Sequence, residues 1–128
     1  MTNEPLLLLA GTSAVALAPR LSASGYATVD WLCAGVTFSD GPEVGDPVAA
    51  VLAADQADLI GELRQRFGGM TILLDLEQDS VEARAASLRS GADDFWVSGV
   101  GASDLLMRLR LHRTIQSRAA RRPLPLQF

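Results

Sequence analysis

Four carboxylates lie where they could hold a metal ion, close to the ends of two apolar runs. Asp55 follows "VAAVLA" and Asp75 ends "MTILLD", and Glu77 and Asp79 come shortly afterwards. Because Mg²⁺ prefers several hard oxygen ligands, these side chains could together form an acidic pocket. The alternative is that Asp55 and Asp79 cap helices and that Glu77 is a solvated loop residue. We adopt this alternative and expect no metal site and no cofactor.

Other groups with catalytic potential are few. His112 is the only histidine and Cys33 the only cysteine, so neither belongs to a motif with metal-ligand spacing. The chain shows no Ser-His-Asp set and no glycine-rich phosphate loop, and in "GTSAV" we expect Thr12 to cap a helix. We expect His112 to be a packed or half-exposed side chain in the middle of a helix, and Cys33 to be a buried, inert thiol. The sequence thus predicts no catalytic residues and a protein that is not an enzyme.

Short apolar runs alternate with helical segments along the chain. The five expected strands are Leu6–Ala10, Tyr26–Leu32, Val48–Ala53, Met70–Asp75 and Phe95–Val97. The expected helices are 12–21, 55–67, 79–91 and 103–118, with Asp55, Asp79 and Ser103 as N-caps. Residues 35–46 are glycine-rich and are expected to form mainly a loop, so the second helix is weakened or missing. The alternation predicts an α/β fold with a doubly wound, five-stranded parallel sheet.

The chain is acidic overall, but its charges are unevenly distributed. Its net charge is −4, all 11 basic residues are arginines, and all 15 acidic residues precede Leu105. An acidic body argues against nucleic-acid binding by the domain itself. The 128 residues contain one cysteine, and no apolar run approaches the roughly 20 residues of a membrane span. We therefore expect one cytoplasmic domain that does not bind a membrane.

The phrases "LRSGADDFWVS" and "SDLLMRLRLHR" resemble the closing part of a bacterial response-regulator receiver domain of the OmpR/PhoB type. The ending "PLPLQF" is similar to the short strand that opens the winged-helix DNA-binding domain in that subfamily. The resemblance implies strand order 2-1-3-4-5, as in CheY and flavodoxin, with functional groups at the carboxyl ends of the strands. It also implies a receiver-like domain over 1–119. Residues 120–128 would then be a linker and the start of a DNA-binding domain not contained in this chain.

The residues that carry phosphorylation in such domains have no counterparts here. An ordinary receiver domain uses an acidic pair after the first strand, an acceptor aspartate after the third, and a hydroxyl and a lysine after the fourth and fifth. The matching positions in this chain are Ala10, Gly11, Ala53, Asp75 and Ser98. Without metal anchors or a lysine, a transferred phosphoryl group would not be stabilised. Since Asp55 becomes the acceptor only if the strand register slips by two residues, we expect an atypical, degenerate receiver domain.

The last expected helix carries two apolar faces. At about 100° per residue, one face faces the sheet and the other lies roughly opposite. The first consists of Leu105, Leu106 and Leu109, and the second of Met107, Leu111 and Ile115. Because one helix cannot easily bury both faces in a single domain, the second is a candidate partner surface. The alternative is that the C-terminal tail folds back over it.

The resemblance also implies how two copies would meet. OmpR/PhoB-type receivers dimerise through the helix before the fifth strand, that strand, and the last helix. The matching charges are Arg84, Asp94, Asp104 and Arg108. We expect Arg84 to pair with Asp104 of a second copy and Asp94 with Arg108 of a second copy, around an apolar contact. The alternative interpretation of these charges is an ordinary solvated face.

These expectations lead to one main functional hypothesis and two alternatives. The main one is a phosphorylation-independent regulatory and dimerisation domain of a two-component-type transcription regulator, reaching DNA only through a further domain. The first alternative is a stand-alone adaptor or ligand sensor that binds a protein or a small molecule through the remodelled site. It is motivated by the shortened stretch between the third and fourth strands and by the glycines that follow Cys33. The second alternative is an active receiver that uses Asp55 as acceptor.

Overall fold

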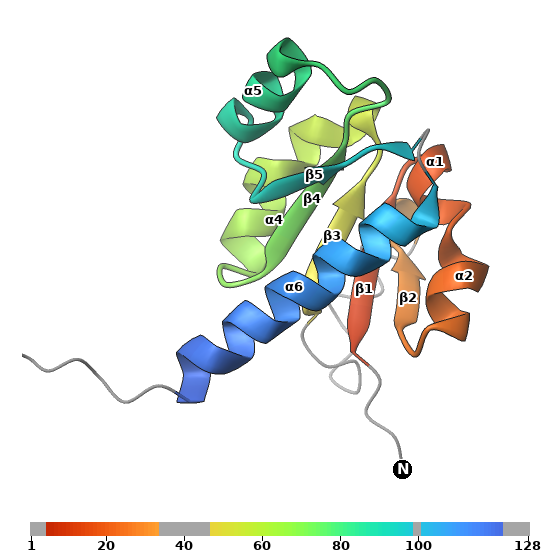
Figure 1. Cartoon of the computed structure of the whole chain (residues 1–128), viewed down its shortest axis with the longest axis vertical. Helices are drawn as coiled ribbons and strands as arrows, with labels where there is room; N and C mark the ends of the chain where they lie inside the picture. The colour runs from red at the N-terminus through yellow and green to blue at the C-terminus, as the bar shows by residue number, and fades with distance from the viewer. Residues whose placement is uncertain (1–4, 34–46, 99–100, 122–128) are drawn as a thin grey trace, which may run out of the picture.

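The computed structural model describes residues 5–33, 47–98 and 101–121, which form an α/β fold around one parallel sheet (Figure 1). The sheet has five strands in the order β2-β1-β3-β4-β5. Their bounds are Leu6–Ala10 for β1, Ala27–Asp30 for β2, Ala49–Leu52 for β3, Thr71–Asp75 for β4 and Asp94–Trp96 for β5. The fold class and the strand order are therefore confirmed. The expected glycine-rich loop and weakened helix at 35–46 lie outside the described residues.

Helices cover both faces of this sheet. They are α1 (Thr12–Val15), α2 (Ala18–Ala23), the 3₁₀ segment η1 (Ala54–Leu59), α4 (Ile60–Arg66), α5 (Val81–Arg89) and α6 (Ala102–Arg121). In Figure 1, α6 is the long blue helix that crosses one face of the sheet. No helix in the described part of the chain is both long enough and apolar enough to cross a membrane.

Each strand supplies alternate residues to two separate cores, because successive side chains point to opposite faces. Leu7 and Leu9 of β1 belong to the core under α1, α2 and α6, in which Leu105 and Leu109 are almost fully buried. The neighbouring Leu8 joins the core under α4. This burial on both faces explains why the strands read as continuous apolar runs.

Several expected helix starts are wrong. Gly11, not Thr12, precedes α1, and no side chain caps that helix. Asp55 lies inside η1, which follows Ala53, and Ser103 lies inside α6, which begins at Ala102. Polar residues near a helix start thus marked its neighbourhood but not its first residue.

The start of α5 shows why one cap was misassigned. The expected cap, Asp79, bonds to Arg84 through both carboxylate oxygens, at 2.6 and 2.7 Å. Ser80 is the N-cap instead, and its hydroxyl accepts a hydrogen bond from the Ala83 N–H at 3.0 Å. A charge-assisted bond to a guanidinium is stronger than a bond to a backbone N–H, so Asp79 takes the arginine.

The first expected helix, 12–21, is divided into α1 and α2. Pro19 lies in the first turn of α2, where its missing N–H costs nothing. Inside a continuous helix, its ring would clash with the carbonyl group four residues earlier and would remove one hydrogen bond. The chain therefore ends α1 at Val15 and starts again at Ala18.

The last helix is longer than the sequence indicated. We expected it to end near Arg118, but α6 continues to Arg121. Residues 122–128 lie outside the described part of the chain, so the linker and the start of a second domain at 120–128 stay a prediction.

Arg64 fastens α4 to the start of two strands. Its guanidinium donates to the carbonyl oxygens of Met70 at 2.7 Å and Gly91 at 2.8 Å, and to the carboxylate of Asp93 at 2.7 Å. The same Asp93 carboxylate accepts the Ile72 N–H at 2.8 Å. The first aspartate of "GADDFW" is therefore a structural residue that joins α4, β4 and the approach to β5.

Replacing Arg64 tests this role. We expect Arg64→Ala to lower the free energy of unfolding by about 1–2 kcal/mol, because two carbonyl groups and a carboxylate lose a half-buried donor. Urea unfolding followed by circular dichroism measures the change. Arg89→Ala is the control, since Arg89 is exposed at the end of α5, and it should stay within about 0.5 kcal/mol of the parent. Equal losses in both variants would contradict the role assigned to Arg64.

Candidate functional site

The positions matched to a phosphorylation site gather at one edge of the sheet, because the strands are parallel and end on the same side. Ala10 ends β1 and Asp75 ends β4, while Ala53 and Ser98 come just after β3 and β5. The Ala53 N–H donates to the Ala10 carbonyl at 2.8 Å, so these two chain segments are in direct contact. The edge is thus assembled from the residues that the sequence pointed to.

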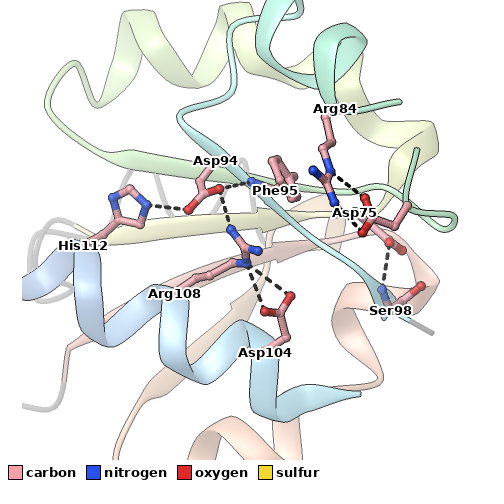
Figure 2. Close-up of polar contacts among 9 residues, drawn as sticks. Asp75, Arg84, Asp94, Phe95, Ser98, Asp104, Arg108 and His112 are labelled. Carbon is pink, nitrogen blue, oxygen red and sulfur yellow. Dashed lines mark hydrogen bonds and ion pairs between the residues drawn. The ribbon is translucent and has the colours of Figure 1, made fainter. Parts of the chain in front are cut away.

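Asp75 is the centre of this edge. Its side chain accepts the Ser13 hydroxyl at 2.9 Å, the Glu77 N–H at 2.8 Å and the Ser98 N–H at 3.3 Å. Asp75 is only 2% exposed, so its carboxylate depends on these donors in place of water. Figure 2 shows Ser98 beside it. The structure therefore ties Asp75 to α1, to the turn after β4 and to the end of β5.

The position after β1 has no room for a ligating side chain. Gly11 has φ 95°, a conformation that residues with a Cβ rarely adopt. A Cβ built on Gly11 would lie 2.4 Å from the Cβ of Ala53, well inside van der Waals contact. The segments that follow β1 and β3 are in contact at Gly11 and Ala53, and this close contact requires a small residue at both positions.

The described residues do not bring the four carboxylates of the alternative acidic pocket together. Asp55 is exposed, and its side chain accepts only a long bond of 3.4 Å from the Gln56 amide. Asp79 is bound to Arg84, which holds the pKa of that carboxyl below its usual value. Among the described residues, no three His, Cys, Asp or Glu side chains lie close enough together to hold a metal ion. Asp75 and Asp79 thus make bonds in two separate local structures.

A cavity of about 490 Å³ opens beside this edge, between α1 and the end of β2. Its wall is formed by Gly11, Thr12, Val15, Ala16, Asp30, Leu32, Cys33, Asp55 and Gln56. The Asp30 Oδ1 atom is buried and has no hydrogen-bond partner within the described residues. This mostly apolar cavity with an unsatisfied carboxylate oxygen is a candidate ligand site.

Cys33 lies at this cavity and differs from expectation. It is exposed, whereas the sequence suggested a buried thiol. Its thiol donates to the Asp30 carboxylate at 3.5 Å. That bond, together with the negative charge of Asp30, raises the pKa of Cys33 above its usual value. The thiol is consequently less reactive than an ordinary exposed cysteine, because the thiolate is the nucleophile.

A second group of charges lies between β5 and α6, centred on Asp94 (Figure 2). The Asp94 carboxylate bonds to Arg108 at 2.8 Å and to the ring of His112 at 2.9 Å. Arg108 also contacts Asp104, at 3.2 Å. These are bonds within one chain, whereas the resemblance had suggested that Asp94 and Arg108 pair between copies. His112 is partly buried, as expected, and its bond to Asp94 was not predicted, although its i+4 spacing from Arg108 indicates a shared helix face.

Phe95 connects this network to α5. The Arg108 guanidinium lies 4.6 Å from the centre of the Phe95 ring, and the Arg84 guanidinium lies 5.7 Å from it. Two arginines from different helices therefore approach one aromatic ring, at distances where cations and rings attract. Phe95 therefore links a side chain of α5 to a side chain of α6 across β5. Within the chain Arg84 pairs with Asp79, and not with Asp104.

The exposed apolar residues lie on the same two helices. On α6, the expected second face is indeed exposed, with Met107, Leu111 and Ile115 at 71%, 54% and 51%. On α5, Val81 and Leu88 are 76% and 54% exposed. Arg84 and Leu88 follow Val81 by three and seven residues, so all three lie on one side of the helix. The α5 residues were not predicted, although the seven-residue spacing of Val81 and Leu88 indicates one side of a helix. We call these five residues the α5–α6 apolar surface.

Solved structures similar to this chain are response-regulator receiver domains. A CheY-like receiver domain protein from Methanospirillum hungatei has 17% identity and a TM-score of 0.67, covering 91% of this chain and 99% of that one. The signal receiver domain of an HD domain-containing protein from Pseudomonas fluorescens has 19% identity and a TM-score of 0.67, covering 95% and 96%. NtrX from Brucella abortus has 18% identity and a TM-score of 0.70, covering 99% of this chain and 31% of that one.

These likenesses establish the CheY-like receiver fold and nothing finer, because the sequence identities are low. No protein-family model matches the chain, and no curated protein matches its sequence.

The bonds at Asp75 can be tested by a matched pair of variants. We expect Asp75→Ala to lower the free energy of unfolding by about 2–4 kcal/mol, because three donors lose their acceptor in a buried place. Asp55→Ala should change it by less than about 0.5 kcal/mol, since Asp55 is exposed. Denaturant titration of both proteins gives the comparison. A larger loss of unfolding free energy in Asp55→Ala than in Asp75→Ala would contradict the stabilising role assigned to the hydrogen bonds of Asp75.

Proposed function

We propose that this chain is a signalling regulatory domain that dimerises through the α5–α6 apolar surface without being phosphorylated. The main support for this proposal is a contrast between the carboxyl edge of the sheet and the α5–α6 apolar surface. At the edge of the sheet, the buried carboxylate of Asp75 accepts hydrogen bonds from uncharged donors only, within the described residues. On α5 and α6, five large apolar side chains stay exposed beside an ordered set of charges.

The chemistry of phosphoryl transfer supports the first half. A receiver must neutralise the equatorial oxygens of the transferred group, with a metal ion and with positive side chains. Gly11 and Ala10 supply no metal ligand, and the chain contains no lysine. A phosphoryl group placed near Asp75 would instead meet a second negative charge. The shape of the edge thus favours a domain whose state is not set by phosphorylation.

The apolar surface supports the second half. Each of its five residues would contribute about 1 kcal/mol if the exposed part were covered. In a two-fold dimer both copies use this surface, so each residue contributes twice. Association opposes this gain by about 4–15 kcal/mol, because the two copies lose translational and rotational freedom. The balance is small, so we expect a weak dimer with a dissociation constant in the micromolar range or above.

The charges around this surface would set orientation more than affinity. Asp94 and Arg108 are already bonded within the chain, with side chains 17% and 28% exposed. Exchanging these bonds for cross-subunit bonds would gain little, because the total number of ion pairs would stay the same. We therefore revise the expected pairing: the Asp94 network holds α6 against β5 and presents the apolar residues, and pairs across the dimer would be secondary.

The transcriptional part of the proposal concerns what lies beyond this domain. Because α6 extends to Arg121, a dimer formed along this helix would hold two following segments at a defined distance. NtrX illustrates that this fold occurs within a longer chain, since the present chain spans only 31% of it. In an OmpR/PhoB-type protein, the following segment would be a DNA-binding domain and the location would be the cytoplasm.

Dimerisation can be tested with two leucines of nearly equal exposure. Leu111 on α6 is 54% exposed and Leu32 at the other end of the sheet is 53% exposed. Leu111→Glu should weaken dimerisation about tenfold or more, because two carboxylates would be placed in the contact. Leu32→Glu should leave it unchanged. Sedimentation equilibrium over a wide concentration range measures both, and a parent chain that stays monomeric throughout would disprove dimerisation.

Sedimentation after treatment with a phosphoryl donor, together with intact-mass measurement, tests whether dimerisation is independent of phosphorylation. Incubation with acetyl phosphate and Mg²⁺ should add no phosphoryl group to the intact mass and should leave the monomer–dimer balance unchanged. A mass gain that disappears in Asp55→Asn would restore the alternative of an active receiver.

The cavity beside Asp30 favours a second candidate function, a sensor of a small ligand. Its size suits a compact molecule, and the buried Asp30 Oδ1 requires a hydrogen-bond donor, such as an amine. We expect some apolar primary amines to raise the melting temperature, and Asp30→Asn to abolish the shift. Asp58→Asn, at an exposed carboxylate outside the cavity, should keep it. No shift across a broad amine library would remove this candidate.

A further inference from the structure

A second cavity, of about 410 Å³, lies between α6 and the turn that joins α2 to β2. Its wall is formed by Ser24, Gly25, Tyr26, Leu106, Arg110, Arg113, Thr114 and Ser117. The turn residues come just before β2 begins at Ala27, so this cavity is at the end of the sheet opposite to Asp75. It is therefore separate from both sites described above.

The α6 residues of this cavity form a third side of the helix. Leu106, Arg110, Arg113 and Ser117 follow one another at four- and three-residue steps, which places them on one side at about 100° per residue. This side lies between the buried face with Leu109 and the exposed face of the α5–α6 apolar surface. The residues thus combine two guanidinium groups and a hydroxyl above the half-buried Leu106.

The two arginines have no structural task in the described part of the chain. Arg64, Arg66, Arg84 and Arg108 each pair with a carboxylate. Arg110 and Arg113 pair with none of the described acids, although both line the same cavity. They also lie more than two turns before the end of α6, so the helix dipole, which acts within the last turn, does not account for them.

Tyr26 gives an independent indication of a ligand. Only 8% of the residue is exposed, and it packs in the core with Leu105 and Leu109. Tyr26 also forms part of the cavity wall. Its hydroxyl makes no hydrogen bond among the described residues and is not one of the buried polar atoms, so it is accessible and free to donate to a ligand. The cavity wall therefore carries a hydroxyl donor in addition to the two arginines.

The side chains of the cavity wall are suited to bind an oxyanion that carries an organic group. Two guanidinium groups and a hydroxyl donor match a doubly charged phosphate, to which arginine can bond through two parallel N–H groups. The cavity is much larger than a bare phosphate ion and includes the apolar Leu106, so room remains for the rest of a ligand. The acidic body of the protein, with a net charge of −4, disfavours a nucleic-acid backbone.

We propose that this cavity binds a small phosphate monoester. Arg110 and Arg113 contact the phosphate, and the Tyr26 hydroxyl donates a hydrogen bond to it. The Ser24 and Ser117 hydroxyls complete the polar wall. The Thr114 hydroxyl is not a donor here, because it already donates to the Arg110 carbonyl at 3.0 Å.

Isothermal titration calorimetry of the whole chain with AMP, glycerol 3-phosphate and inorganic phosphate tests the site. At least one monoester should bind more tightly than inorganic phosphate. Arg110→Gln and Arg113→Gln should each weaken that binding about tenfold or more, through loss of a charge-assisted hydrogen bond. Tyr26→Phe keeps the packed ring and should weaken it about threefold to tenfold. Arg118→Gln, on the same helix but outside the cavity, should bind as the parent does.

Three results would overturn the proposal. One is the absence of binding by any of the three probes at low ionic strength. Another is inorganic phosphate binding as tightly as both monoesters, which would leave the organic part of the ligand without a role. The third is an equal loss in Arg110→Gln, Arg113→Gln and Arg118→Gln, which would indicate diffuse attraction to a basic helix in place of a site.

Discussion

The burial of the Asp75 carboxylate is the constraint on which the rest of the carboxyl edge depends. A buried charge must be compensated, and here the compensation comes from a hydroxyl on α1 and two backbone N–H groups. These donors belong to three segments that are far apart in the sequence, so one side chain fixes the relative positions of α1, β4 and the end of β5. Within the described residues, this edge is held together by the hydrogen bonds that the chain itself provides.

The strands and the faces of α6 could be predicted from sequence, while the polar partners could not. Residues 6–10 and 72–74 are apolar throughout because both faces of the sheet are covered, and this pattern is local. The predicted caps are wrong for different reasons: Asp55 and Ser103 lie inside helices that begin one residue earlier, while at Asp79 a neighbouring polar residue, Ser80, is the cap. At Asp79, the choice was decided by Arg84, five residues further on, through its side-chain bond. Whether Asp94 meets Arg108 within or between chains is likewise invisible in a charge pattern.

α6 shows how much a single helix can carry. Its buried side holds the core together through Leu105 and Leu109, and its side chains toward β5 bind Asp94. The two remaining sides have no partner in the described part of the chain, one being apolar and the other basic. Because a helix is a rigid element over this length, whatever contacts one of these sides also restrains the others. The proposed dimer contact and the proposed phosphate site are thereby mechanically linked.

The contact between Gly11 and Ala53 prevents a simple substitution that would place an acidic side chain after β1. Restoring a metal-binding acid after β1 would place a side chain on a backbone with φ 95°, in space that the Ala53 methyl group already fills. No single replacement at either position removes both obstacles, since the main chain itself would first have to rotate. A designer who wished to place a metal-binding acid after β1 in this scaffold would therefore have to rebuild the whole turn after β1 together with the segment after β3.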